Sequence, residues 1–254
     1  MISLLLAAVV AAIAWRLRWL TGGGALAATV VGAVVLRFGG LLWAAALVAF
    51  FLSGSALTLA GRARKTQPEH RGSGRTAAQV IGTGGVATTV TLLWGAGLSP
   101  GLHALLPPAF FGALAAAAAD TWATEIGMLS PLPPRLITTW RQVRPGTSGG
   151  ITLLGSTAGL AGAALMATFG LIHAGGNWWV FAGVWAAGVL SMFADSLMGA
   201  TVQASFRRAD GAVTEEPGGD AVLVRGISWI TNPVVNLLAT LVGAAVAGVL
   251  AVWM

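Results

Sequence analysis

Long apolar runs separated by short polar segments follow one another along the whole sequence. A helix that crosses the hydrocarbon core of a bilayer needs about 20 apolar residues, with a range of about 17–25. Runs of this kind cover residues 1–15, 22–37, 40–60, 80–99, 104–128, 150–173, 177–202 and 229–252. The first two are short, so the sequence predicts seven or eight membrane-spanning helices. The predicted fold class is all-α: a polytopic membrane helix bundle that forms a single integral-membrane domain over residues 1–254.

Composition excludes the main soluble classes of protein. Only 9% of the 254 residues are charged and 56% are hydrophobic, whereas a soluble globular domain carries about 25% charged residues. A soluble enzyme and a disordered chain are therefore excluded. The absence of cysteine also excludes a disulfide scaffold, a thiolate nucleophile and a zinc–thiolate site. We expect no nucleic-acid partner.

Basic residues gather in the segments that would lie on one side of the membrane. With eight alternating helices, thirteen of the fourteen Lys and Arg residues fall on that side, and only Arg37 falls on the other. Cytoplasmic loops carry an excess of basic residues, so these loops are predicted to be cytoplasmic. The 36 glycines and the single lysine are typical of a high-GC bacterial genome, and we expect the bacterial inner membrane. The alternative, which accounts for most basic loops, is that these charges only orient the protein and contact lipid headgroups.

Three carboxylates interrupt the apolar runs. Asp120 and Glu125 lie near the end of the run at 104–128, and Asp195 lies near the end of the run at 177–202. An ionisable residue inside a bilayer costs about 2.5–3.5 kcal/mol on the most lenient scale, so it normally faces a partner, a cavity or a substrate path. At 1.5 Å per residue, Asp120 and Asp195 are predicted to lie about 10–12 Å inside the cytoplasmic boundary. The alternative is that each carboxylate only bonds a neighbouring helix.

The surroundings of these carboxylates add two expectations. Asp120 and Glu125 are five residues apart, about 140° around an ideal helix, so a shared face cannot be assumed. The segments around Asp120 and Asp195 resemble each other, which indicates an internal parallel repeat of about 80–128 and 147–202. The other acidic residues lie in polar loops, where a charge needs no special explanation: Glu69, Asp210, Glu215, Glu216 and Asp220.

Glycine and hydroxyl residues precede a helix at 147–149. A helix N-terminus presents free N–H groups and a positive dipole end, and glycine lets an anion approach the backbone closely. Thr147, Ser148 and Gly149 have this character, and Arg141 and Arg144 come shortly before them. Small residues also permit close helix packing, so both anion binding and packing remain open here.

Arg75 and two asparagines stand at other helix starts on the same predicted side. Arg75 belongs to a basic, hydroxyl-rich segment, where a polyphosphate site and a lipid-facing patch would look alike. Asn232 can cap a helix that continues with Pro233. Asn236 lies four residues later on the same face, where an amide can bond a ligand or hold a metal-binding carboxylate. The three histidines show no shared spacing and are predicted to be surface residues: His70, His103 and His173.

The predicted cytoplasmic half therefore combines carboxylates, arginines and phosphate-compatible helix starts. Mg²⁺ is typically held by one or two carboxylates plus substrate phosphates, and arginines balance the remaining charge. A site recessed by about 10 Å at a membrane face suits a lipid-borne substrate, because the tail can stay in the bilayer. The residues predict phosphate chemistry or phosphate transport at the cytoplasmic face.

Several motifs, in order along nearly the whole chain, resemble an integral-membrane family that contains plant phytyl-phosphate kinase and transmembrane protein 19. The motifs lie at 75–85, 119–127, 133–140, 145–150, 195–203 and 232–236. The resemblance implies a membrane kinase that transfers a phosphoryl group from a nucleoside triphosphate, such as CTP, to a prenyl monophosphate such as phytyl phosphate. The product would be the prenyl diphosphate.

The resemblance also implies roles for individual residues. Asp120, Glu125 and Asp195 would be catalytic and would hold Mg²⁺ or position the acceptor phosphate. Substrate and phosphate would be bound by Arg75, Arg141, Arg144, Thr147, Ser148, Gly149, Asn232 and Asn236. The implied partners are the prenyl-phosphate lipid, the nucleoside triphosphate and the lipid bilayer.

A transporter or flippase of a phosphorylated prenyl lipid is the alternative function. The buried carboxylates would then be proton or cation sites that couple an ion gradient to lipid movement. A transporter needs a polar path through both halves of the membrane, whereas almost every polar feature here falls on one predicted face. This distribution favours the enzyme.

Overall fold

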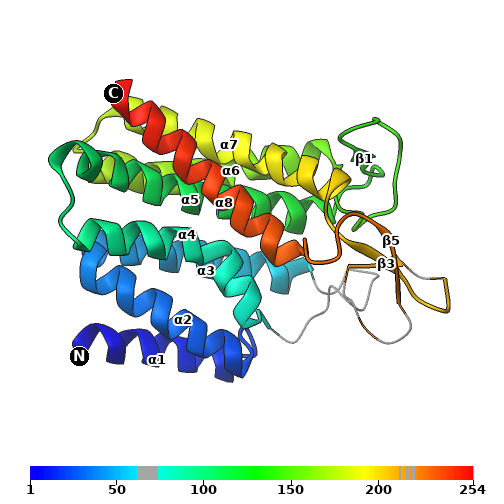
Figure 1. Ribbon diagram of the computed structural model, residues 1–254, viewed down its shortest axis with the longest axis horizontal. Helices are drawn as coiled ribbons and strands as arrows, with labels where there is room; N and C mark the ends of the chain where they lie inside the picture. Colours follow the sequence, from blue (N-terminus) through cyan, green and yellow to red (C-terminus); the bar gives the residue numbers. More distant parts are fainter. Residues whose placement is uncertain (62–73, 212, 216–217, 219–220, 254) are drawn as a thin grey trace.

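The computed structural model describes residues 1–61, 74–211, 213–215, 218 and 221–253. Within these residues eight α-helices pack side by side into one bundle, with both chain termini at the same end (Figure 1). Their bounds are α1 Ile2–Arg16, α2 Gly22–Val34, α3 Gly40–Gly61, α4 Ala77–Gly95, α5 Pro100–Gly127, α6 Leu153–His173, α7 Trp178–Thr201 and α8 Asn232–Leu250, with a short 3-10 helix, η3, at Ala251–Trp253. The predicted all-α fold class is confirmed. Predictions for the basic residues of 62–73, for Glu69 and His70, and for Glu216 and Asp220 lie outside the described residues.

The described residues include six helical segments that are long and apolar enough to cross a membrane. One of them, Gly22–Gly61, contains two helices, because α2 continues through a π-helical turn, η1 (Val35–Gly39), and the chain then turns at Gly40 with φ +78°. Counting α2 and α3 separately gives seven spans, and the shorter α1, with 15 residues, is an eighth helix. The prediction of seven or eight helices therefore agrees with the structure.

Helix α5 is the centre of the bundle. It contacts α3, α4, α6, α7 and α8, and thirteen consecutive residues, Pro107–Ala119, are buried. Alanine and glycine dominate this stretch because lipid tails are as apolar as leucine, so membrane helices gain stability from close backbone approach. A Cβ atom at Gly243 of α8 would lie 2.6 Å from the carbonyl oxygen of Gly112. Small residues thus let α8 lie directly against α5.

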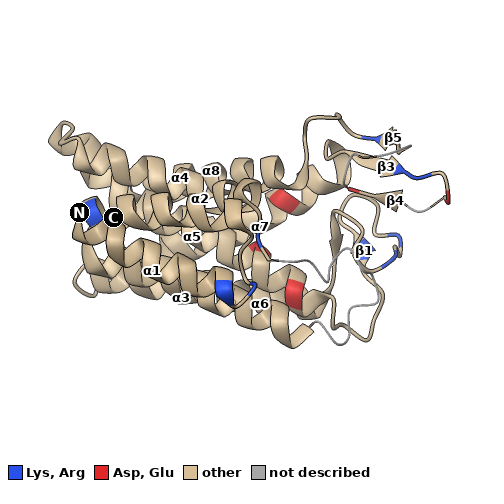
Figure 2. Ribbon diagram, turned by 90° about the horizontal axis from the view of Figure 1, so that it is seen from below, with Lys and Arg blue, Asp and Glu red and all other residues tan. Residues whose placement is uncertain are grey.

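The long connections gather at one end of the bundle. The loop from α5 to α6 contains a two-stranded antiparallel pair, β1 (Arg135–Leu136) with β2 (Gly150–Ile151). The connection from α7 to α8 forms a three-stranded antiparallel sheet in the order β4-β3-β5, from Val213–Thr214, Ser205–Arg207 and Val222–Arg225. Most of the described basic residues lie at this loop end, as Figure 2 shows. Arg37 lies in η1, which contacts the end of α4 at Gly95, opposite the loops.

Aromatic side chains fill the opposite end of the bundle. The Trp43 ring stacks on Phe110 with a centroid separation of 4.1 Å, and its Nε1 donates to Nδ1 of His173 at 3.4 Å. The ring of His103 stacks on Trp94 at 3.6 Å. His173 is exposed, as predicted, whereas His103 is half-buried, so the surface prediction is only partly right for His103. This end is closed by apolar and aromatic packing.

The close contact between α5 and α8 leads to a prediction about the stability of the protein. Gly243→Val should destabilise the protein by about 1–3 kcal/mol, because the new side chain overlaps the Gly112 backbone and must push α8 away. Gly101→Val is the matched control, since nothing lies within 4 Å of a Cβ at Gly101. Thermal unfolding in detergent measures the difference. Equal melting temperatures for the two variants would contradict the close approach of α5 and α8.

Candidate functional site

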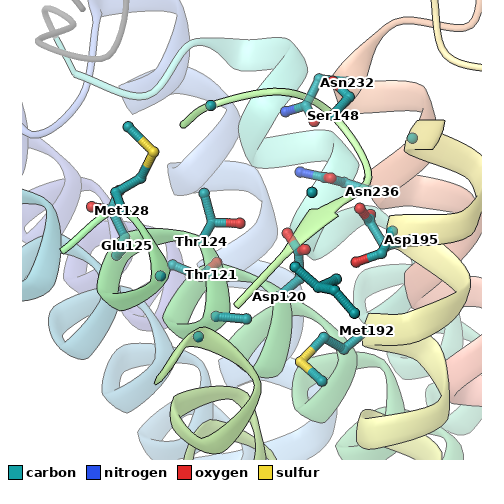
Figure 3. Close-up of a pocket in the computed structure, with 18 of the residues that line it drawn as sticks. Asp120, Thr121, Thr124, Glu125, Met128, Ser148, Met192, Asp195, Asn232 and Asn236 are labelled. Carbon is teal, nitrogen blue, oxygen red and sulfur yellow. The ribbon is translucent and has the colours of Figure 1, made fainter. Parts of the chain in front are cut away.

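A cavity of about 390 Å³ lies at the loop end of the bundle, between helices α3 to α8 and the loop that joins α5 to α6. Figure 3 shows it in close-up, with side chains from several helices directed into it. Nine of the eleven residues predicted for a site line this cavity: Arg75, Asp120, Glu125, Thr147, Ser148, Gly149, Asp195, Asn232 and Asn236. The other two, Arg141 and Arg144, are exposed and lie outside its lining. The roles implied for all eleven residues stay predictions.

Asp120 and Asp195 face each other across the cavity floor. Their carboxyl groups, from α5 and α7, lie within hydrogen-bonding range of one another (Figure 3). Asp195 is only 9% exposed. Two carboxylates in contact repel each other unless a proton or a cation lies between them. The two carboxylates therefore favour the binding of a cation, above all a metal ion.

Amide groups of α8 complete this side of the cavity. With its amide oriented to satisfy both neighbours, Asn236 donates to Oδ2 of Asp195 at 3.2 Å and to the carbonyl oxygen of Asn232 at 3.3 Å. Asn232 begins α8, but its side chain does not cap the helix: Thr231 holds the capping position and makes no side-chain cap bond. Asn236 thus holds the Asp195 carboxylate, and Asn232 adds a second amide to the lining of the cavity.

Glu125 lies on a different side of the same cavity. Its Oε1 accepts a hydrogen bond of 2.8 Å from the Thr58 hydroxyl of α3. This follows from the spacing of five residues, which turns Glu125 away from Asp120 around the helix. Among the described residues, no group of three or more His, Cys, Asp or Glu side chains is placed to hold one metal ion. Of the three carboxylates predicted to hold a metal ion, Asp120 and Asp195 lie together, and Glu125 lies apart from them.

Arg75 brings positive charge to the wall of the cavity. Its backbone N–H donates to Trp19 at 2.9 Å, and its carbonyl accepts from Thr21 N at 3.1 Å, which ties it to the connection between α1 and α2. The guanidinium lies 5.4 Å from the Phe50 ring centroid and 5.6 Å from that of Phe51, a cation–π arrangement. Burial lowers the pKa of the Arg75 guanidinium, and the nearby Glu125 carboxylate opposes that shift.

The loop at 146–150 is held rigidly against α7. Gly149 has φ +80°, and a Cβ there would lie 2.6 Å from the Ser196 carbonyl oxygen. The Thr147 hydroxyl donates to the Arg144 carbonyl at 2.7 Å, so it closes the turn of its own loop. The Ser148 hydroxyl instead donates to the Glu215 carboxylate. Gly149 and Thr147 therefore shape the loop, and Ser148 is the member whose hydroxyl reaches across the cavity.

Two cavity residues were not predicted from the sequence. Gln203, which follows α7, and Glu215, which follows β4, both line the cavity and both contact Ser148. The sequence predicts Glu215 to be a residue of a polar loop, because no sequence pattern reveals that the sheet β4-β3-β5 folds back over the helix ends. Gln203 is the last residue of the motif at 195–203, and this position was the signal that could have pointed to it.

Comparison with known proteins establishes the family. Residues 5–244 match the family described as "Integral membrane protein DUF92", and the chain belongs to this family. It is 31% identical over 245 residues to an uncharacterized membrane protein of Methanocaldococcus jannaschii, covering 96% of this chain and 91% of that protein. It is 28% identical over 239 residues to Protein PGR of Arabidopsis thaliana, covering 84% and 83%. No solved structure matches the chain significantly.

The family membership confirms the resemblance found in the sequence motifs. An uncharacterized membrane protein of Synechocystis is also 32% identical over 223 residues, covering 82% of this chain and 76% of that protein. The relatives thus extend along most of the chain and come from an archaeon, a plant and a cyanobacterium. The protein is an integral membrane protein whose candidate site lies in the part of the chain that the family shares.

The contact between Gly149 and α7 makes a second stability prediction. Gly149→Ala should lower the apparent melting temperature in detergent several times more than Gly211→Ala. Both glycines have positive φ, which costs a side chain about 1–2 kcal/mol, but a Cβ at Gly211 meets nothing within 4 Å, whereas one at Gly149 overlaps α7. Equal shifts for the two variants would show that the loop does not press against α7.

Proposed function

We propose that the protein is a membrane kinase that transfers a phosphoryl group from a nucleoside triphosphate, such as CTP, to a prenyl monophosphate such as phytyl phosphate. The contact of Asp120 with Asp195 in the cavity carries this proposal. The family membership supports it, because the motifs that resemble the phytyl-phosphate kinase family surround these two residues. The product is the prenyl diphosphate.

The residues of the cavity floor fit a Mg²⁺–phosphate ligand. Mg²⁺ usually keeps several waters and takes one or two carboxylates together with substrate phosphates, rather than a cage of protein ligands alone. Asp120 and Asp195 supply two carboxylates within reach of one ion, and Asn236 fixes the orientation of Asp195. When bound, the ion would neutralise charge on the phosphates. Glu125 does not share this position and instead balances Arg75.

The reaction requires the phosphate charges to be balanced and the two substrates to be positioned, more than it requires proton transfer. An anionic oxygen of the prenyl monophosphate attacks the terminal phosphorus of the nucleotide, and the bond from that phosphorus to the nucleoside diphosphate breaks. The nucleophile carries no proton at neutral pH, so no general base is required. Arg75, Asn232 and Ser148 can donate hydrogen bonds to phosphate oxygens from three sides of the cavity.

In this proposal the headgroup of the lipid enters the cavity while its tail stays in the bilayer. Apolar side chains, such as Leu59, Met128 and Phe193, line the cavity beside the polar ones. The excess of basic residues at the loop end favours a cytoplasmic position for this cavity, where a soluble nucleotide is available. The proposed location is the inner membrane of a bacterium.

Packing beneath the cavity supports a kinase over a lipid-phosphate transporter. A transporter needs a polar path through both halves of the membrane. Here the buried run Pro107–Ala119 of α5 and the aromatic cluster around Trp43 occupy the other half of the bundle. An ion bound at Asp120 and Asp195 would therefore find no polar path through these residues to the other side of the membrane.

Phosphoryl transfer by purified protein in detergent tests the proposal. Labelled ATP and CTP are offered with Mg²⁺ and phytyl or geranylgeranyl phosphate to wild type, Asp120→Asn and Asp195→Asn. Each variant should lose roughly a hundredfold or more of the activity, the scale expected when a group that stabilises transition-state charge is removed. Asp210→Asn is the control, because Asp210 lies in the turn between β3 and β4, outside the cavity.

Two results would contradict the proposal. Absence of transfer with every nucleotide and lipid pair, from protein shown to be folded, would favour transport of the lipid phosphate, to be tested by gradient-driven movement in liposomes. Transfer that survives in both Asp120→Asn and Asp195→Asn would place the reaction away from the cavity floor.

A further inference from the structure

The Ser148 hydroxyl lies between a carboxylate and a buried amide. It donates to Glu215, and its oxygen accepts from Nε2 of Gln203 at 3.0 Å. The three residues come from separate segments: Ser148 lies in the loop before β2, Gln203 lies just after α7, and Glu215 directly follows β4. All three line the cavity. The contact is thus made inside the candidate site and not on the outer surface of the loops.

Gln203 fixes the direction of the Ser148 hydroxyl. Its side chain is only 2% exposed, and its backbone is anchored, since Gln203 N donates to Met198 at 3.0 Å. An amide nitrogen can only donate, so it takes a lone pair of Ser148 Oγ and leaves the Ser148 hydrogen for an acceptor on the other side. The Ser148 hydroxyl is therefore oriented to donate a hydrogen bond to an anion.

Glu215 supplies that anion from within the chain itself. A carboxylate oxygen and a phosphate oxygen are equivalent partners for a hydroxyl donor, because both are anionic acceptors. Glu215 also lies close enough to Asp195 for their charges to repel. A phosphate that entered the cavity with Glu215 in place would meet a third carboxylate and find the Ser148 hydroxyl already occupied.

We propose that Ser148 forms an oxyanion subsite for a phosphate oxygen of the ligand, that Gln203 positions its hydroxyl, and that the Glu215 carboxylate occupies this subsite until the ligand displaces it. The proposal deepens the proposed function and rests on it for the identity of the phosphate ligand. Glu215 then acts as an internal competitor of the ligand. Ligand binding at Ser148 requires the Glu215 carboxylate to leave the Ser148 hydroxyl.

Binding of inorganic pyrophosphate, measured by calorimetry on the full chain in detergent with Mg²⁺ present, tests this directly. Glu215→Gln keeps the shape of the side chain and removes its charge, so the affinity for pyrophosphate should rise about tenfold. Adding Ser148→Ala to Glu215→Gln should remove most of this gain in affinity, because most of the gain depends on the freed hydroxyl. Asp210→Asn, an equal charge change in the turn between β3 and β4 and outside the cavity, should leave the affinity unchanged.

Adding Gln203→Met to Glu215→Gln tests whether Gln203 positions the Ser148 hydroxyl or only packs in the structure. It removes the amide at similar volume, so the affinity for pyrophosphate should fall about threefold while the melting temperature stays near that of Glu215→Gln. A lower melting temperature with unchanged affinity would reduce Gln203 to a structural role.

Several outcomes would overturn the subsite. Weaker binding by Glu215→Gln would make Glu215 a contributor to binding instead of a competitor. Unchanged binding, equal tightening by Asp210→Asn, or no pyrophosphate binding by any of these proteins would each remove the basis of the proposal. Because pyrophosphate binding requires no phosphoryl transfer, failure of the kinase assay and failure of this subsite are distinguishable results.

Discussion

The contact between the carboxyl groups of Asp120 and Asp195 is the interaction on which the rest of the site depends. Two such groups can meet inside a membrane bundle only where their helices approach closely. At Gly188 of α7, a Cβ would lie 2.8 Å from the Cβ of Ala115 in α5, so small residues on both helices permit this approach. The alanine-rich stretch of α5 therefore brings the carboxylates together as well as filling the bundle.

One end of the bundle is closed by packing, and the other end contains the candidate site. At one end, Trp43, Phe110 and neighbouring rings close the helices with apolar contacts. At the other end, the connections fold back over the helix termini, and they contribute Arg75, Ser148 and Glu215 to one cavity. This division suits a reaction on a lipid headgroup at one membrane face, because a charged headgroup can be bound without opening the apolar half.

The sequence predicts the helices better than it predicts the site. Each long apolar run became a helix, because the bilayer requirement acts on local sequence alone. Asp120 and Asp195 were found because a charge in an apolar run is exceptional, and Asn236 because it shares a helical face with Asn232. Arg141 and Arg144 were expected near the phosphate loop but are exposed, and Glu215 was missed, since both outcomes depend on how loops of distant segments pair in space.

The most direct measurement of the contact between α5 and α7 uses the absence of native cysteine. A variant that combines Asp120→Cys with Asp195→Cys is treated with a short bifunctional thiol reagent, and its mass is measured by intact-protein mass spectrometry. This variant should take up one linker that joins both thiols. Asp120→Cys combined with Asp210→Cys should take up two separate linkers. Two linkers on the first pair, in folded protein, would show that Asp120 and Asp195 do not face each other and would contradict a shared site.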